Sequence, residues 1–184
     1  MAINHAAMDY SYLDEGVEKT DPKQLRIMKK LSNHLARTPG YDQIEVSRGK
    51  GTVSAREAED TLSILEAPQA QYGDPVGRDA LSRRETWTLL IQGWPKDDPA
   101  HPSDPAYKLA AAVNRQLAMI VEEQGRDGKR REDNLFNLGG DLAEMSIGQT
   151  IVRPVSNEHG NSRLAEFFIP LLLTIQTDKL NPSH

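Results

Sequence analysis

The chain contains no cysteine among its 184 residues. It can therefore form no disulfide, no thiolate nucleophile and no zinc site built on sulfur. It also lacks a long apolar run. The longest one, residues 167–175, is interrupted by Pro170 and Thr174, whereas a membrane-spanning helix needs about 20 apolar residues. The N-terminus lacks the basic and then apolar pattern of a signal peptide. We expect a soluble protein with no membrane partner.

An excess of basic side chains is missing as well. The chain has 27 acidic and 22 basic residues, a net charge of −5 and a pI near 5.6, whereas proteins that coat nucleic acid normally carry a basic face. One short basic cluster, Arg126 with residues 129–131, is more typical of a solvated loop than of a binding surface. We therefore expect no sequence-specific nucleic-acid partner. The length favours a single domain.

The patterns that usually mark an active site are absent too. No serine lies in a Gly-x-Ser-x-Gly elbow, and the five histidines show no paired metal-ligand spacing. The best candidates for metal binding or acid–base chemistry are Asp97, Asp98, His101 and Asp104. They lie in a proline-rich connector, where Asp beside Pro is ordinary turn and capping chemistry. We expect no metal, no cofactor and no enzymatic activity; the alternative is a small metal-dependent enzyme that uses loop 97–104.

What the sequence does contain is organised around residues 84–123. Trp87, Leu89 and Ile91 alternate with mostly polar neighbours, which predicts a strand with one apolar face. Pro95 should end this strand, because proline cannot donate to a sheet ladder. After a polar connector, Asp104 is predicted to cap a helix at about 106–123. Its apolar stripe consists of Leu109, Ala110, Val113, Leu117, Ile120 and Val121.

Other segments complete the predicted fold. A helix is predicted to begin with Asp21 as its N-cap and Pro22 at its first position. Strands are predicted at 62–67, 145–152 and 167–177, and residues 41–46 form a short strand or an extended connection. The buried stripe of the first helix is Leu25, Met28, Leu31 and Leu35, widened by Ile27. The economical architecture is an α+β domain, a four-stranded mixed β-sheet with two helices packed on one face.

The domain is predicted to span residues 21–180. Residues 1–20 show no periodicity and are interpreted as a flexible N-terminal arm. The alternative for this arm is that it becomes ordered against a neighbouring subunit.

The predicted strand at 167–177 is apolar on more than one face. Its odd positions are all large and apolar and belong in the core. Its even positions include Phe168, Pro170 and Leu172, which is more than a solvent-facing side requires. Pro170 predicts an edge position or a bulge. If helices cover only one face, Phe168 and Leu172 form a patch of the kind that contacts partners; the alternative is that residues 1–20 or 124–140 cover it.

Several sequence blocks resemble the tail terminator proteins of tailed bacteriophages. They are scattered over roughly residues 22–178, and the resemblance is one of pattern, since none of them is a chemical motif. The central blocks are WTLLIQGW at 87–94, DDP at 97–99 and HPSDPAY at 101–107, and the others are LSILEAP at 62–68, SIGQTIVRP at 146–154 and FFIPL at 167–171.

Tail terminators form a ring of six copies that caps the tail tube, stops its growth and presents a surface to the head connector. The resemblance therefore implies a virion protein of the tail or neck, assembled in the host cytoplasm, with room for DNA to pass through the ring. The implied partners are further copies of the chain, the tail tube protein and a head connector or neck protein. We place the contact surface at Phe168, Pro170, Leu172 and Trp94. Another neck or head-completion protein is the main alternative.

Overall fold

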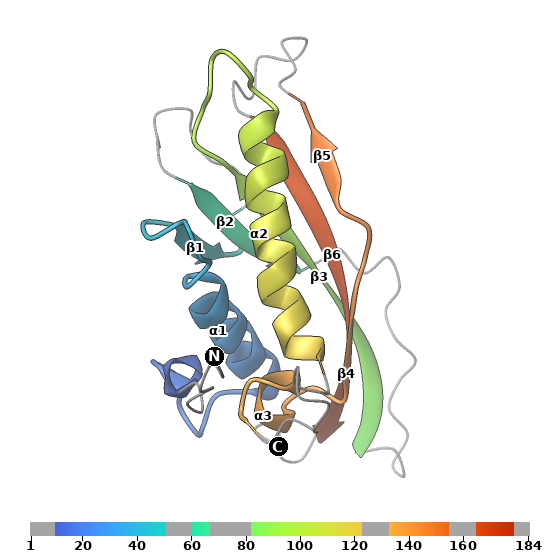
Figure 1. The fold of residues 1–184 in the computed structure, drawn as a ribbon. Coiled ribbons are helices and arrows are strands. Elements are labelled where there is room, and N and C mark those ends of the chain that lie inside the picture. Colours follow the sequence, from blue (N-terminus) through green and yellow to red (C-terminus); the bar gives the residue numbers. More distant parts are fainter. Residues whose placement is uncertain (1–9, 51–59, 67–81, 123–132, 155–164, 179–184) are drawn as a thin grey trace, which may run out of the picture.

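The computed structural model has one layer of sheet and one layer of helices, and it describes residues 10–50, 60–66, 82–122, 133–154 and 165–178 (Figure 1). The basic cluster at 126–131 lies outside the described residues. In chain order the elements are η1 (Ser11–Asp14), α1 (Lys23–Leu35), β1 (Glu45–Arg48), β2 (Thr61–Glu66), β3 (Ser82–Trp94), α2 (Asp104–Val121), α3 (Asn137–Gly140), β4 (Glu144–Ile147), β5 (Ile151–Arg153) and β6 (Glu166–Asp178).

The sheet is centred on the long antiparallel pair of β3 and β6. Its strand order is β1-β2-β3-β6-β4, and β5 also pairs with β6. β1 and β2 run parallel, and the other neighbours run antiparallel. The α+β class and the mixed sheet are thus confirmed, but the described sheet has six strands rather than four. One addition is β1, which forms at the end of the ambiguous segment 41–46.

The other addition arises because the predicted strand at 145–152 is broken in two. β4 pairs with β6 up to Ile147 opposite Leu171, and β5 resumes at Ile151 opposite Phe168. Pro170 lies opposite the break. Its carbonyl accepts a hydrogen bond from Gly148 N at 2.7 Å, but its ring nitrogen has no hydrogen to return one. The ladder therefore contains a bulge, which was one of the two expectations for Pro170. The other, an edge position, is wrong, because β6 pairs with β3 on one side and with β4 and β5 on the other.

Helices α1 and α2 bury their apolar stripes in one common core on the same face of the sheet (Figure 1). In α2 the expected stripe is buried from Leu109 to Ile120, and Val121 is partly buried. In α1 the buried stripe is rotated from the predicted one. Leu25 is 39% exposed and Ile27 is fully buried, because Ile27, Leu31 and Leu35 follow the spacing of four residues that keeps side chains on one helical face.

Both predicted aspartate caps are wrong. The Asp21 carboxylate receives no bond from the first turn of α1; it accepts instead from Glu18 N at 2.9 Å and from Lys29 Nζ at 2.6 Å. Asp104 is the first residue of α2, Ser103 occupies the N-cap, and the N-cap makes no side-chain hydrogen bond. The contribution of about 1 kcal/mol that an aspartate N-cap makes to stability is therefore absent, although the negative charge of Asp104 still interacts favourably with the helix dipole.

Residues 10–20 of the expected arm lie against α1 of the same chain. Tyr10 and Leu13 are buried in the core, and Asn33 Nδ2 donates to Leu13 O at 3.0 Å. His34 is buried between Tyr12 Oη at 2.8 Å from its Nδ1 and Gln116 O at 2.9 Å from its Nε2. Since a carbonyl only accepts, Nε2 carries the proton and Nδ1 accepts from the tyrosine. Residues 1–9 lie outside the described part.

The segment before β4 is anchored to α1 by charge. Leu135 and Leu138 of this segment are fully buried. Asp141 pairs with Arg26 at 2.7 Å and with Lys30 at 2.8 Å. These ion pairs fix the entry to β4, and α3 is a single turn whose backbone is left-handed at Leu138, with φ of 53°.

The contact between Asp21 and Lys29 should make stability depend on pH in the acidic range. The Lys29 ammonium, and next the Glu18 N–H, lower the pKa of the Asp21 carboxyl below its usual 3.8. A lowered folded-state pKa gives stability that is present above the unfolded pKa and is lost as the pH falls through the folded one. We therefore expect Asp21→Asn to be less stable than the wild type at pH 6, with the difference shrinking below about pH 4. Urea unfolding across pH measures it.

Asp42→Asn is the matched control, because Asp42 is exposed and makes no hydrogen bond or ion pair within the described part of the chain. If the stability difference between Asp21→Asn and the wild type stays constant from pH 6 to pH 2, the lowered pKa of Asp21 is not its cause.

Gly93 is required by the packing of β3 against β6. Its register partner is Phe167, and a Cβ at Gly93 would lie 2.2 Å from two ring carbons of Phe167. Gly93→Ala should therefore cost about 1–3 kcal/mol or more by overpacking, measured by urea denaturation. In the Gly93→Ala background, Phe167→Leu should cost less than it does alone. If the losses in stability from Gly93→Ala and Phe167→Leu simply add, the Phe167 ring is not what excludes a side chain at position 93.

Candidate interaction surface

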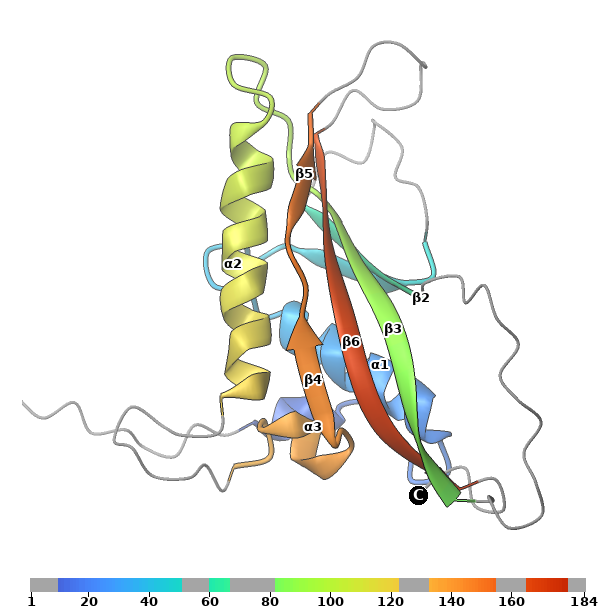
Figure 2. The same ribbon diagram turned by 90° about the vertical axis from the view of Figure 1, so that its right-hand side faces the viewer.

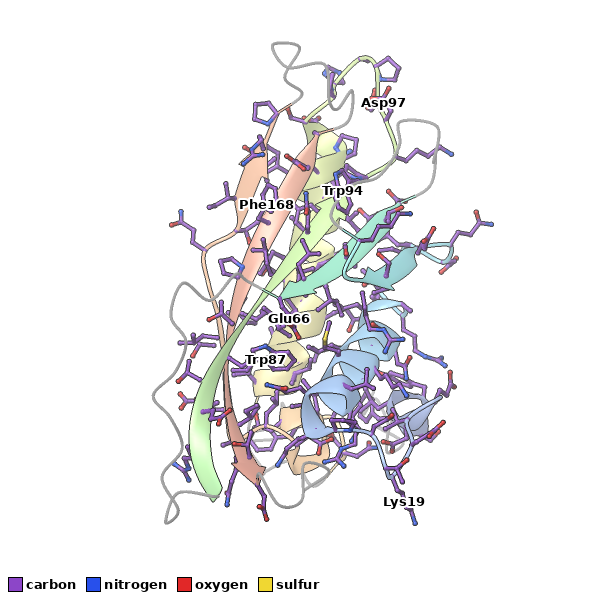
Figure 3. All side chains as sticks on the ribbon, turned by 180° about the vertical axis from the view of Figure 1, so that it is seen from behind. Lys19, Glu66, Trp87, Trp94, Asp97 and Phe168 are labelled. Carbon is purple, nitrogen blue, oxygen red and sulfur yellow. The ribbon has the colours of Figure 1, made fainter. Side chains whose placement is uncertain are left out.

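The sheet has a second face, opposite the one that packs against α2; Figure 3 views the molecule from this side, with α2 behind the strands. Side chains alternate across a strand, so the odd positions of β6 from Phe167 to Ile175 are fully buried while the even positions point to this second face. We call it the open sheet face. Its apolar members that are at least partly accessible, within the described residues, are Leu65, Leu90, Ile151, Phe168, Pro170 and Leu172.

The register joins most of these side chains into one strip. Pro170 lies opposite Leu90, and Phe168 lies opposite Ile151. Leu172 is 49% exposed and Ile151 is 57% exposed. Phe168, Pro170 and Leu90 are half-buried. Two large, accessible apolar side chains on a strip of this kind mark a surface that is covered by a partner in many proteins.

A polar cluster closes one end of the strip. Glu166 accepts from Gln92 Nε2 at 2.8 Å and from Arg153 at 2.9 Å. The Arg153 guanidinium also lies over the Phe168 ring, 5.0 Å from its centroid, a cation–π contact that holds the ring in place. The strip therefore has a fixed shape at this end and accessible side chains toward Leu172.

Three of the four residues that the sequence predicted to contact partners lie on this strip. Phe168, Pro170 and Leu172 share the face because they are two residues apart on one strand. Trp94 points to the same side as Gln92, two residues before it on β3, but it is only 3% exposed and offers almost no surface to a partner (Figure 3).

Ile151 and Leu90 were not predicted as contact residues. Ile151 reaches the face only because the bulge opposite Pro170 shifts the register between β4 and β5. Leu90 could have been predicted from the alternating pattern of its strand, because it is an apolar residue at a position where that pattern has polar ones.

The connector proposed for metal binding is built as a turn. Asp98 Oδ1 accepts from Ala100 N at 3.0 Å and from His101 N at 3.3 Å, which is the usual local bonding of aspartate in turns. Asp97 and His101 are exposed, and Asp104 begins α2. Within the part of the chain that the structure describes, no group of three histidine or acidic side chains lies close enough to hold a metal ion.

Comparison with known proteins adds no further constraint. No protein-family model matches the chain, and no curated protein matches it either. Among the described residues, none of the helices is both long and apolar enough to span a bilayer.

Two adjacent leucines of β6 test the assignment of the two faces. Leu171 is fully buried in the core and Leu172 lies on the open sheet face. Leu171→Ala should cost about 2–5 kcal/mol through lost burial and a cavity. Leu172→Thr, which keeps a good strand former, should cost less than about 1 kcal/mol. Equal losses in urea unfolding would show that Leu172 belongs to the core.

Proposed function

We propose that this protein is a virion structural protein similar to the tail terminators of tailed bacteriophages. Copies of the chain form a ring on the end of the tail tube, stop its polymerisation and join the tail to the head connector. The observation that carries the proposal is the accessible apolar strip at Leu172 and Ile151 on the open sheet face. Such a strip fits a protein that works as part of an assembly.

The location of the resemblance supports the same proposal. The block WTLLIQGW lies in β3, FFIPL lies in β6, and SIGQTIVRP spans the end of β4, the bulge and β5. These are the strands that build the open sheet face. Three of the six blocks of the resemblance therefore lie in strands that form the candidate contact surface, while DDP and HPSDPAY lie in the connector and the start of α2.

The partners follow from the proposed role. They are other copies of the chain in a six-fold ring, the tail tube protein, and a head connector or neck protein. Another neck or head-completion protein would use the same strip against different partners. The enzyme alternative draws no support from the connector, whose Asp98 already serves the turn.

Tails that carry a tagged copy of the protein provide the test. Electron microscopy and native mass spectrometry should find six copies at the head-proximal end of each tail. The double variant Ile151→Arg and Leu172→Arg should melt like the wild type yet be lost from tails, leaving tubes of uncontrolled length, because two charges in a buried contact are costly. Leu25→Arg is the matched control, since Leu25 is also exposed but lies on α1.

Three outcomes decide between the readings. Symmetry other than six-fold or three-fold in the virion would contradict the ring. Cross-linking only to portal-side proteins, with normal tube length in the double variant, would favour a neck protein. Normal incorporation of the double variant would show that the strip is not the contact surface.

A further inference from the structure

The two long helices differ in how they face solvent. α1 carries Lys23, Arg26, Lys29 and Lys30 within 13 residues, whereas the 18 residues of α2 contain only Asp104, Lys108 and Arg115 as charged side chains. The outer side of α2 is instead formed largely by small and apolar residues. Tyr107 is 62% exposed, and Ala111 and Ala118 are exposed as well. A helix with so little charge on its solvent side is typically covered by another element.

A groove runs along the C-terminal half of this helix. It has a volume of about 560 Å³, and its lining consists of Pro39, Ala112, Arg115, Gln116, Ala118, Met119, Val121 and Glu122. Small alanines allow close approach of another backbone, and the methionine can adapt to the shape of what it contacts. The groove is therefore suited to receiving apolar side chains that project from a partner.

The groove is lined by one basic and one acidic side chain, Arg115 and Glu122, and the basic one has the opposite sign to Glu144 on the open sheet face. Arg115 is exposed and makes no hydrogen bond or ion pair with the described residues. Glu144 is exposed on β4, opposite Thr174, on the same face as Leu172, and it likewise has no such contact among the described residues. A guanidinium beside an apolar groove pairs well with a carboxylate beside an apolar strip.

These two surfaces lie on opposite sides of the molecule. Figure 2 shows α2 on one side of the sheet, and the open sheet face looks the other way. A two-fold dimer that pairs like surfaces would cover either the two grooves or the two open sheet faces, and the other surface would stay exposed on both copies. Head-to-tail association covers both kinds, and it closes into a ring when the rotation between neighbours permits.

We propose that the groove along α2 of one copy receives the apolar strip around Leu172 of the next copy, with Arg115 of the first placed against Glu144 of the second. This proposal rests on the proposed ring function and names the two surfaces that meet in it. Leu172 and Ile151 enter the groove beside Ala118 and Met119, and the ion pair sets the register. The occupant of the groove is thus a second copy of this chain.

Disulfide trapping can test the pairing cleanly, because the chain has no cysteine of its own. The double variant Ala118→Cys with Leu172→Cys should give, on oxidation, a ladder of covalent oligomers up to the full ring on denaturing gels. Each single variant should stay monomeric. The control pair Ala118→Cys with Leu25→Cys should also stay monomeric, since Leu25 is exposed outside both surfaces.

Charge reversal gives a second, independent readout. Arg115→Glu and Glu144→Arg should each lower the yield of rings, counted by electron microscopy, at least tenfold, and their combination should restore most of it. All these side chains are exposed or half-exposed, so the variants should fold like the wild type in thermal melts.

The failures are distinguishable. Dimers from Leu172→Cys alone would overturn the proposal in favour of a two-fold contact. No ladder, with rings still visible in the same sample, would overturn this pairing and leave the ring function standing. No ladder and no ring, either alone or on tails, would overturn both.

Discussion

The pairing of β3 with β6 is the constraint on which the other elements depend. The two strands are in register from Ser82 opposite Asp178 to Gly93 opposite Phe167. This long ladder fixes which side chains of both strands enter the core, because a slip of one residue would move every one of them to the other face. α2, β2 and β4 are then placed by the apolar side chains that this register presents.

Two residues of this ladder determine its local shape. Gly93 leaves the space that the Phe167 ring fills, which sets the end of the ladder next to the connector. Pro170 cannot donate a hydrogen bond to the neighbouring strand, so that strand is divided into β4 and β5 around Gly148. The same interruption brings Ile151 beside Phe168. A single proline therefore contributes both to the outline of the sheet and to the composition of its open face.

The open sheet face and the outer side of α2 are linked by a simple consequence of a two-layer fold. One layer of helices can cover only one face of a sheet. The other face and the outer side of the helices must be either polar or covered by something outside the domain. In this chain neither surface is fully polar, since Leu172, Ile151 and Tyr107 are accessible. Assembly into a closed ring is one arrangement that removes both surfaces from water.

The sequence by itself determined the features that depend on local periodicity and on proline. It predicted the α+β class, the core face of β6 and the burial of Leu109 to Ile120 on α2, because alternation and helical spacing act within one segment. It also placed Phe168, Pro170 and Leu172 on one side.

Only the tertiary structure decided what depends on contacts between distant segments. Asp21 pairs with Lys29 rather than capping α1, Trp94 is buried, residues 10–20 lie on α1, and Ile151 joins the strip. Each of these outcomes is set by which neighbour competes for a side chain once the fold has formed, and no local pattern contains that information.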